Sequence, residues 1–401
     1  MQRREGLVPA LAAVLSGLMA SFVIHAPAGV PGNYSDIVSF WSRPWVSGGQ
    51  LPYVTEPFEY PPVSGLLLYV ARMVGGDLTG YYNVFSLMSF AAGALLAWSC
   101  WSISRRQGKG LKAFYFILPS VVFCGIFNFD LFHAAFMMLS IQGFVYGRRS
   151  MSAASLGLAV STKLVSAVLL PVFLISLLDP GLRSWTVGRS PRTWWPALKG
   201  AFADARRWHW RPALLFSGVF AAVVAAFNVP FMVANFQSWY GTFTYVGGWG
   251  LEDVWYVWVF QNPATWGYAK VFGFVLMAVL LARVYTLKTD VVMKCFLAVG
   301  AYLMGTYIYA PQYNLLVIPL LAVLAADSPS LYLWDTFNVL IILTWFIGYQ
   351  SPTWAPTLAW TLPQEFALLR TVAFVWMAAE LLKREGWTAG ALLPWLRQKT
   401  G

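Results

Sequence analysis

Residues 151–178, MSAASLGLAVSTKLVSAVLLPVFLISLL, form a long apolar run with a lysine near its middle. As one helix it would be roughly 42 Å long at 1.5 Å per residue, which is long for a single membrane crossing. A single crossing would also put the basic stretch 179–211 across the membrane from the other basic clusters. We therefore expect two short helices that break near Lys163, enter the membrane and return, an arrangement that is tolerated where it lines a protein cavity.

The whole chain is strongly apolar. Its 401 residues are 59% hydrophobic and only 11% charged, whereas about 25% of the residues of a soluble domain are charged. Apolar runs long enough to span a bilayer recur from end to end, so we expect a single all-α polytopic membrane domain over 1–401, with about 12 membrane segments. Besides 151–178, the expected spans are 7–24, 81–103, 111–127, 130–147, 212–234, 266–283, 291–309, 311–326, 331–349 and 364–382.

The net charge of +11 orients the chain in the membrane. Most of the 27 Lys and Arg residues fall on one side of this topology, which makes that side cytoplasmic together with both termini. The membrane topology therefore explains the positive charge, and binding to nucleic acid is not needed to account for it. The sequence Ala26-Pro27-Ala28 after the first apolar run imitates a signal-peptidase site, so cleavage there is the alternative to a retained first helix. Three cysteines in or at the ends of apolar segments imply no disulfide framework.

Long connections remain on the outer side. The loop 25–80 has apolar residues at helical spacing around Arg43-Pro44 and an apolar stretch at 62–74 that is too short to span, so we expect interfacial helices there. The loop 235–265 is crowded with aromatic residues, which belong to an interfacial belt or contact a sugar or lipid. Connections this long are usually functional.

Polar residues from six regions of the chain share the depth of the outer boundary. An outer loop is exposed to water, so any one of these residues could simply be a solvated surface residue. Charges beside apolar runs are costly, however, and mark a functional site by default. The set comprises Asp36, Glu59, Asn128, Asp130, His133, Lys163, Glu252, Asp253, Gln312, Tyr313 and Asn314.

Two of these residues suggest chemistry. Asp36 lies beside a low-dielectric wall and can act as a general base, unless Ser35 or Asp36 simply caps the helix that follows. Lys163 can bind phosphate as a point charge, helped by His133 and Gln312, unless it forms an ion pair with Asp130.

Other catalytic classes have little support. No His, Cys, Asp and Glu residues show metal-ligand spacing, although Asp130 and His133 share a helical face and a divalent ion remains possible. No Gly-x-Ser-x-Gly nucleophile elbow is present.

Four blocks of the sequence form a recognisable set. The first outer loop carries YSDIVSFW (34–41), GGQLPY (48–53) and FEYPPVSGLLLY (58–69). The other blocks are FNFDLFHAAFMMLSI (127–141), GLAVSTKLVSAVLLP (157–171) and APQYNLLVIPLLAVL (310–324). In this order the blocks resemble polyprenyl-phosphate-sugar-dependent glycosyltransferases of superfamily C, in particular glycosylphosphatidylinositol mannosyltransferase I and the family 87 α-1,2-mannosyltransferases.

The resemblance implies the superfamily C fold and transfer of a hexose, with mannose favoured, from a polyprenyl or dolichyl phosphate to a glycolipid or glycan acceptor. Transfer would occur with inversion on the extracytoplasmic face of the plasma membrane or endoplasmic reticulum. By this resemblance Asp36 is the base, while Lys163, Gln312 and Tyr313 bind the donor. This sequence has one acid where the family often has two, so a second carboxylate would come from Glu59 or Asp130, with Glu252 and Asp253 as further acceptor-side acids.

Two alternatives remain. The same residues could serve a transporter or flippase of a lipid-linked sugar, although the sequence shows no internal repeat of the kind common in transporters. A protein O-glycosyltransferase of the same superfamily would use a polypeptide hydroxyl as acceptor.

Overall fold

The computed structural model describes residues 6–27, 34–178, 208–347 and 355–386. These residues form helices, joined by loops and one isolated β-bridge between Glu252 and Ile308. The fold is therefore all-α, as expected. Most of the basic loop 179–211 lies outside the described residues.

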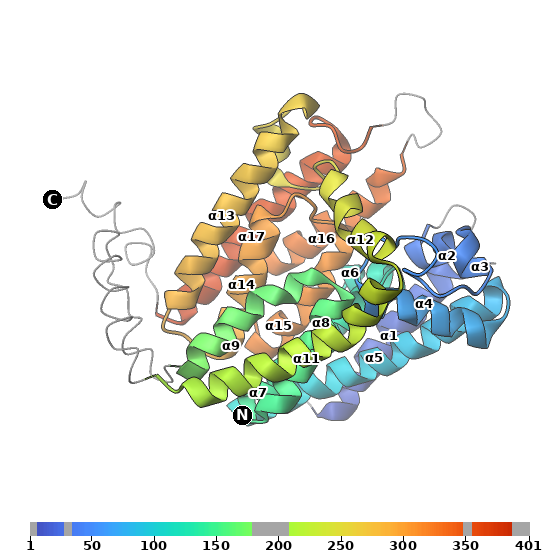
Figure 1. The fold of residues 1–401 in the computed structure, drawn as a ribbon. Coiled ribbons are helices and arrows are strands. Elements are labelled where there is room, and N and C mark those ends of the chain that lie inside the picture. Colours follow the sequence, from blue (N-terminus) through green and yellow to red (C-terminus); the bar gives the residue numbers. More distant parts are fainter. Residues whose placement is uncertain (1–5, 28–33, 179–207, 348–354, 387–401) are drawn as a thin grey trace.

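The bounds of the helices, with η marking 3-10 turns, follow in chain order (Figure 1). They are α1 (Leu7–His25), α2 (Asp36–Phe40), α3 (Pro44–Ser47), α4 (Pro62–Gly75), α5 (Leu78–Gln107), η1 (Ala113–Ile117), α6 (Pro119–Cys124), α7 (Asp130–Val145), α8 (Arg149–Thr162), η2 (Leu164–Val168), α9 (Leu169–Leu178), α11 (Trp210–Ala234), α12 (Phe236–Gly248), η5 (Trp255–Trp258), η6 (Pro263–Thr265), α13 (Trp266–Thr286), α14 (Val291–Gly305), η7 (Pro311–Tyr313), α15 (Asn314–Leu324), α16 (Pro329–Trp345) and α17 (Leu362–Arg384).

The chain is an integral membrane protein. Among the described residues, 4 helices are long and apolar enough to cross a membrane: Leu7–His25, Leu78–Gln107, Trp210–Ala234 and Pro263–Thr286. Several other apolar helices have only 10–17 residues. The predicted total of about 12 segments is therefore not confirmed.

The run 151–178 breaks at Lys163, as predicted. Lys163 has extended backbone angles, φ −159° and ψ 136°, between α8 and η2. Beyond the break the chain returns, because Phe173 in α9 stacks on Phe144 at the end of α7, with ring centroids 4.6 Å apart. Figure 1 shows α9 and α11 side by side, and the amide of His209 donates to the carbonyl of Leu178 where they meet (3.0 Å). Lys163 thus lies at the tip of a re-entrant hairpin.

The predicted span 111–127 is wrong. This segment divides into η1 and α6 at Leu118, whose ψ of 148° is extended. Pro119 follows Leu118, and a proline disfavours helical backbone at the residue before it. The result is a short, bent element.

The predicted outer loop forms α2, α3 and α4 within its described residues. That these helices lie at the membrane interface stays a prediction. The hydroxyl of Ser35 accepts a hydrogen bond from the amide of Val38 and caps α2 (3.2 Å). Because Ser35 supplies the cap, the carboxylate of Asp36 remains available for other partners. The hydroxyl of Ser64 in α4 donates to the carbonyl of Thr162 (2.8 Å), which ties this loop to the break at Lys163.

The first helix is part of the packed core. The amide of Ile126 donates to the hydroxyl of Ser21 (2.9 Å), and the hydroxyl of Tyr82 donates to the carbonyl of Phe22 (2.8 Å). Leu18 is fully buried. These contacts join α1 to α5 and to the residues after α6, which contribute to the site.

Candidate active site

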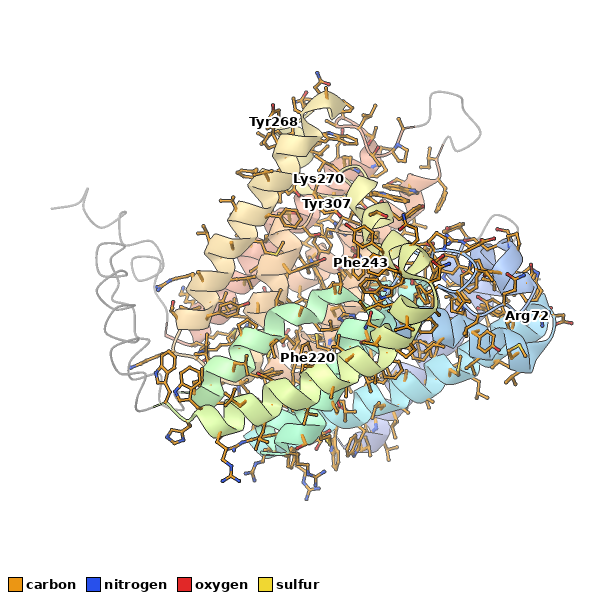
Figure 2. All side chains as sticks on the ribbon, viewed as in Figure 1. Arg72, Phe220, Phe243, Tyr268, Lys270 and Tyr307 are labelled. Carbon is orange, nitrogen blue, oxygen red and sulfur yellow. The ribbon has the colours of Figure 1, made fainter. Side chains whose placement is uncertain are left out.

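Loops and helix ends from several parts of the chain line a cavity of about 1270 Å³. The labelled Phe243 and Tyr307, which both line it, locate the cavity in Figure 2. Its charged lining residues come from separate parts of the chain and are Asp36, Arg43, Glu59, Lys163, Glu252 and Asp253. The predicted catalytic acid and the predicted phosphate ligand therefore share one chamber.

Asp36 is partly buried at the start of α2. Its Oδ2 accepts a hydrogen bond from Nδ2 of Asn128 (2.5 Å), and the same amide nitrogen donates to the hydroxyl of Tyr60 (2.8 Å). The amide of Ile37 donates to the carbonyl of Phe127 (3.3 Å). These contacts fix α2 against the residues that lead into α7.

The surroundings of Asp36 suit a general base. Burial raises the pKa of its carboxyl to about 7, opposed by hydrogen bonds from Tyr34 and Asn128 and by the charge of Lys163. A base is most effective when its pKa lies close to the working pH. Asp36 can therefore exchange a proton near neutrality.

Lys163 is held at the cavity by an ion pair. Its Nζ lies 2.8 Å and 2.9 Å from the carboxylate oxygens of Asp130. The ammonium also lies 4.2 Å from the centroid of the Tyr313 ring and 5.5 Å from that of Tyr60. The ion pair considered as the alternative is thus present, while Lys163 still lines the cavity.

Asp130 and His133 lie behind the cavity wall. Both are fully buried, and neither lines the chamber. Nε2 of His133 is 2.6 Å from the hydroxyl of Ser166, in the re-entrant hairpin. The structure therefore does not bring His133 to the place where a donor phosphate would contact Lys163, and it makes Asp130 the partner of that lysine.

Gln312 and Tyr313 do line the cavity, in the turn that precedes α15. The side chain of Gln312 makes no hydrogen bond to another described residue and is therefore available to a ligand. Tyr313 packs its ring under Lys163. Both therefore share the cavity with Lys163, and their role in binding the donor stays a prediction.

Glu59 reaches the cavity but is already paired. Its two oxygens accept hydrogen bonds from Nη1 and Nη2 of Arg43, each 2.5 Å long. The guanidinium also lies 4.8 Å from the centroid of the Phe40 ring. A two-pronged pair of this kind fixes geometry, so Glu59 is more constrained than a free second acid.

Glu252 and Asp253 lie in the loop after α12 and line the cavity. The amide of Glu252 donates to the carbonyl of Tyr307 (3.0 Å), and the amide of Tyr309 donates to the carbonyl of Glu252 (2.9 Å). Asp253 is fully buried and has a left-handed φ of 54°, which is rare outside glycine. Burial raises the pKa of both carboxyl groups, and the charge of Glu252 raises that of Asp253 further.

Arg370 supports this wall from within the helices, and sequence reasoning missed it. It is fully buried, and its Nη2 donates to the carbonyls of Asp253 (2.8 Å) and Tyr309 (2.7 Å). Nη1 donates to Oδ1 of Asn338 (2.7 Å). A charge inside the expected span 364–382 was the available signal, because such residues are rare in membrane helices.

Among the described residues, no group of three or more His, Cys, Asp and Glu side chains could hold a metal ion. The expectation that the reaction proceeds without a metal stays a prediction.

No protein-family model matches the sequence, and no curated protein matches it. Among solved structures, the chain is similar to ArnT from Cupriavidus metallidurans bound to undecaprenyl phosphate, with 18% identity and a TM-score of 0.47 over 94% of this chain and 72% of that one. It is also similar to the oligosaccharyltransferase of Archaeoglobus fulgidus in the apo form, with 12% identity and a TM-score of 0.41 over 94% of this chain and 56% of that one.

Proposed function

We propose that the chain is a superfamily C glycosyltransferase that moves a hexose from a polyprenyl or dolichyl phosphate to a glycolipid or glycan acceptor. One observation carries this proposal: Asp36, with a pKa of about 7, and Lys163 line the same cavity. The four sequence blocks that resemble this superfamily contribute both residues. Mannose is the first sugar to test, because the families that the sequence resembles use it.

The reaction needs a base and a stabilised leaving group. Asp36 accepts the proton of the acceptor hydroxyl while the oxygen of that hydroxyl attacks the anomeric carbon of the donor. The bond between that carbon and the phosphate oxygen breaks, and its electron pair leaves with the lipid phosphate. Lys163 and Gln312 stabilise the added charge on the phosphate. Attack from the face opposite the leaving group inverts the anomeric carbon.

The cavity also offers an apolar wall for a lipid. Side chains near the end of α16 line it, together with Phe127 after α6. The members from α16 and the residue after it are Ile341, Ile342, Trp345 and Phe346. An isoprenoid chain would lie against this wall while its phosphate reaches Lys163.

The orientation follows from the basic residues. Arg105 and Arg106 stand at the end of α5, and Arg148 and Arg149 stand at the turn from α7 to α8. This turn is at the opposite end of α8 from Lys163. The positive-inside rule then makes the basic end cytoplasmic and the cavity extracytoplasmic.

Transfer of radiolabelled mannose from polyprenyl phosphate tests the proposal. We expect Asp36→Asn to reduce the rate by about 10²-fold or more, because general base catalysis contributes roughly that amount. Glu56→Gln, at an exposed position outside the cavity, is the matched control and should transfer normally. Wild-type transfer by Asp36→Asn would refute the assigned base.

Two further results would change the reaction class. If labelled lipid-linked sugar crosses the membrane of vesicles that contain the protein while no acceptor is glycosylated, the protein is a transporter. If only a peptide hydroxyl is glycosylated, the protein is an O-glycosyltransferase.

A further inference from the structure

One wall of the cavity combines aromatic faces with a carboxylate. We call Tyr245, Trp249, Glu252 and Tyr307 the acceptor wall; all four line the cavity. The ring centroids of Tyr245 and Trp249 lie 5.4 Å apart. The two residues are 50% and 40% exposed, respectively. Aromatic faces carry partial negative charge and attract the weakly positive C–H groups of a sugar ring.

Glu252 is poised to bind hydroxyl groups. Its Oε2 accepts a hydrogen bond from Nε1 of Trp249 (2.7 Å), whereas Oε1 makes no hydrogen bond to any described residue. A carboxyl group exchanges hydrogen bonds with hydroxyl groups in either protonation state. Glu252 therefore fixes the indole ring of Trp249 and keeps one oxygen for a ligand.

The acceptor wall is rigid before any ligand arrives. The backbone of Glu252 pairs with that of Tyr307 and Tyr309, and Arg370 holds the carbonyls of Asp253 and Tyr309. The hydroxyl of Tyr307 donates to the carbonyl of Val246 in α12 (2.9 Å). A site organised in advance loses little entropy on binding.

The charges of the cavity select against a second anion. The lining residues include four carboxylates and only two cations. Both cations are already paired, Arg43 with Glu59 and Lys163 with Asp130. In the described part of the chain, Asp36, Glu252 and Asp253 have no ion pair. A phosphate next to Lys163 is tolerated, but a second anionic group elsewhere in the chamber would find no unpaired cation among the lining residues and would face the carboxyl groups that are ionised.

We propose that the part of the acceptor that enters the cavity is an uncharged sugar, stacked on Tyr245 and Trp249 and hydrogen-bonded to Glu252. This inference rests on the proposed function and names its acceptor class. A phosphate-bearing sugar and a peptide hydroxyl are the competing acceptors.

The test compares three acceptors with polyprenyl-phosphate mannose as donor: a dimannoside, the same dimannoside with a phosphate at its non-reducing end, and a serine-containing peptide. We expect the dimannoside to be the best acceptor, with a KM about tenfold or more below that of its phosphorylated form, because the added phosphate meets no unpaired cation in the cavity. Equal use of the two dimannosides, or preference for the peptide, would overturn the proposal.

Two variants locate the subsite. Trp249→Ala and Glu252→Gln should each raise the KM for the dimannoside about tenfold, with a smaller effect on the KM for the donor. Tyr240→Ala is the matched control, because Tyr240 is exposed on α12 and does not line the cavity. A change in donor KM alone would contradict the assignment of this wall.

Equilibrium dialysis of radiolabelled dimannoside separates this inference from the proposed function. If the wild type binds the dimannoside, Trp249→Ala does not, and no sugar is transferred, the sugar subsite stands while the transferase proposal fails. If transfer occurs but binding by Trp249→Ala equals that of the wild type, the transferase stands and the acceptor wall is wrong.

Discussion

The ammonium group of Lys163 lies 2.8 Å from Oδ1 of Asp130, an acid that does not line the cavity. The cation at the cavity is therefore held from behind by a buried carboxylate. Its remaining ammonium hydrogen can point into the chamber, because a lysine carries three donors. A phosphate would complete the coordination of Lys163 without displacing Asp130.

This relationship predicts two separable effects of Lys163. Lys163→Met leaves the carboxylate of Asp130 buried and unpaired, which should cost about 3–5 kcal/mol of stability. The double variant Lys163→Met, Asp130→Asn should recover most of the thermal stability. Its KM for the lipid donor should still be about tenfold or more above the wild-type value. Recovery of wild-type donor KM in the double variant would show that Lys163 only stabilises the fold.

The pH dependence of transfer should report Asp36. Only the ionised carboxylate can accept a proton, so with a pKa of about 7 the rate should rise as the pH increases through 7 and then level off. The ordinary pKa of an aspartate would place this rise near pH 4. The measurement is kcat/KM between pH 5 and 9, roughly two units on either side of the pKa of Asp36. The pH dependence of kcat/KM reports the pKa of groups in the free enzyme.

Asn128 should tune that profile. Its amide donates to the carboxylate of Asp36 and lowers the pKa of Asp36. Asn128→Ala should therefore move the rise in rate to higher pH, by about one unit for the loss of one hydrogen bond to a charged group. A thermal melt checks that the variant folds. An unshifted profile in a folded variant would remove Asn128 from the site.

Arg370 should be needed for the fold as well as for the acceptor wall. Arg370→Met leaves the carbonyls of Asp253 and Tyr309 without their donor inside the protein. We expect a loss of about 3 kcal/mol or more, since each buried polar group left unpaired costs about 1–3 kcal/mol. Arg106→Met, at an exposed position, is the control for loss of charge. Similar melting temperatures for the two variants would contradict this role.

A close backbone contact at the corner between α4 and α5 predicts sensitivity to one methyl group. A Cβ on Gly80 would lie 1.9 Å from the carbonyl oxygen of Gly75. Gly80→Ala should therefore destabilise the protein by about 1–3 kcal/mol or more. Gly110→Ala, where a Cβ meets nothing within 4 Å, should have little effect. The measurement is the thermal melting of both variants in detergent.

Part of the candidate site could be predicted from the sequence, because a charged residue beside an apolar run is costly and marks a functional site by default. Asp36 and Lys163 stood out on this ground, and both line the cavity. The break at Lys163 followed from the length of the run 151–178 and from the basic residues after it. The partner of Lys163 was one of two alternatives, because sequence spacing cannot show which buried acid a lysine meets.

Other features depend on tertiary contacts and could not be predicted from the sequence. Arg43 and Glu59 are 16 residues apart and form their pair only when the first outer loop folds back. Arg370 reaches the loop at Asp253, 117 residues away. His133 shares a helix with Asp130, and neither lines the cavity, because they contact Ser166 and Lys163 of the re-entrant hairpin. Pro119 marks the bend within 111–127, whereas the apolar composition of that segment alone favours one continuous helix.

An experimental structure of the protein with a bound polyprenyl phosphate would test directly whether Lys163 and Asp36 form one active site. We expect the phosphate within hydrogen-bonding distance of the ammonium of Lys163, in the chamber that Asp36 lines, with the isoprenoid chain against the end of α16. A phosphate bound elsewhere, with Lys163 contacting Asp130 alone, would refute this site.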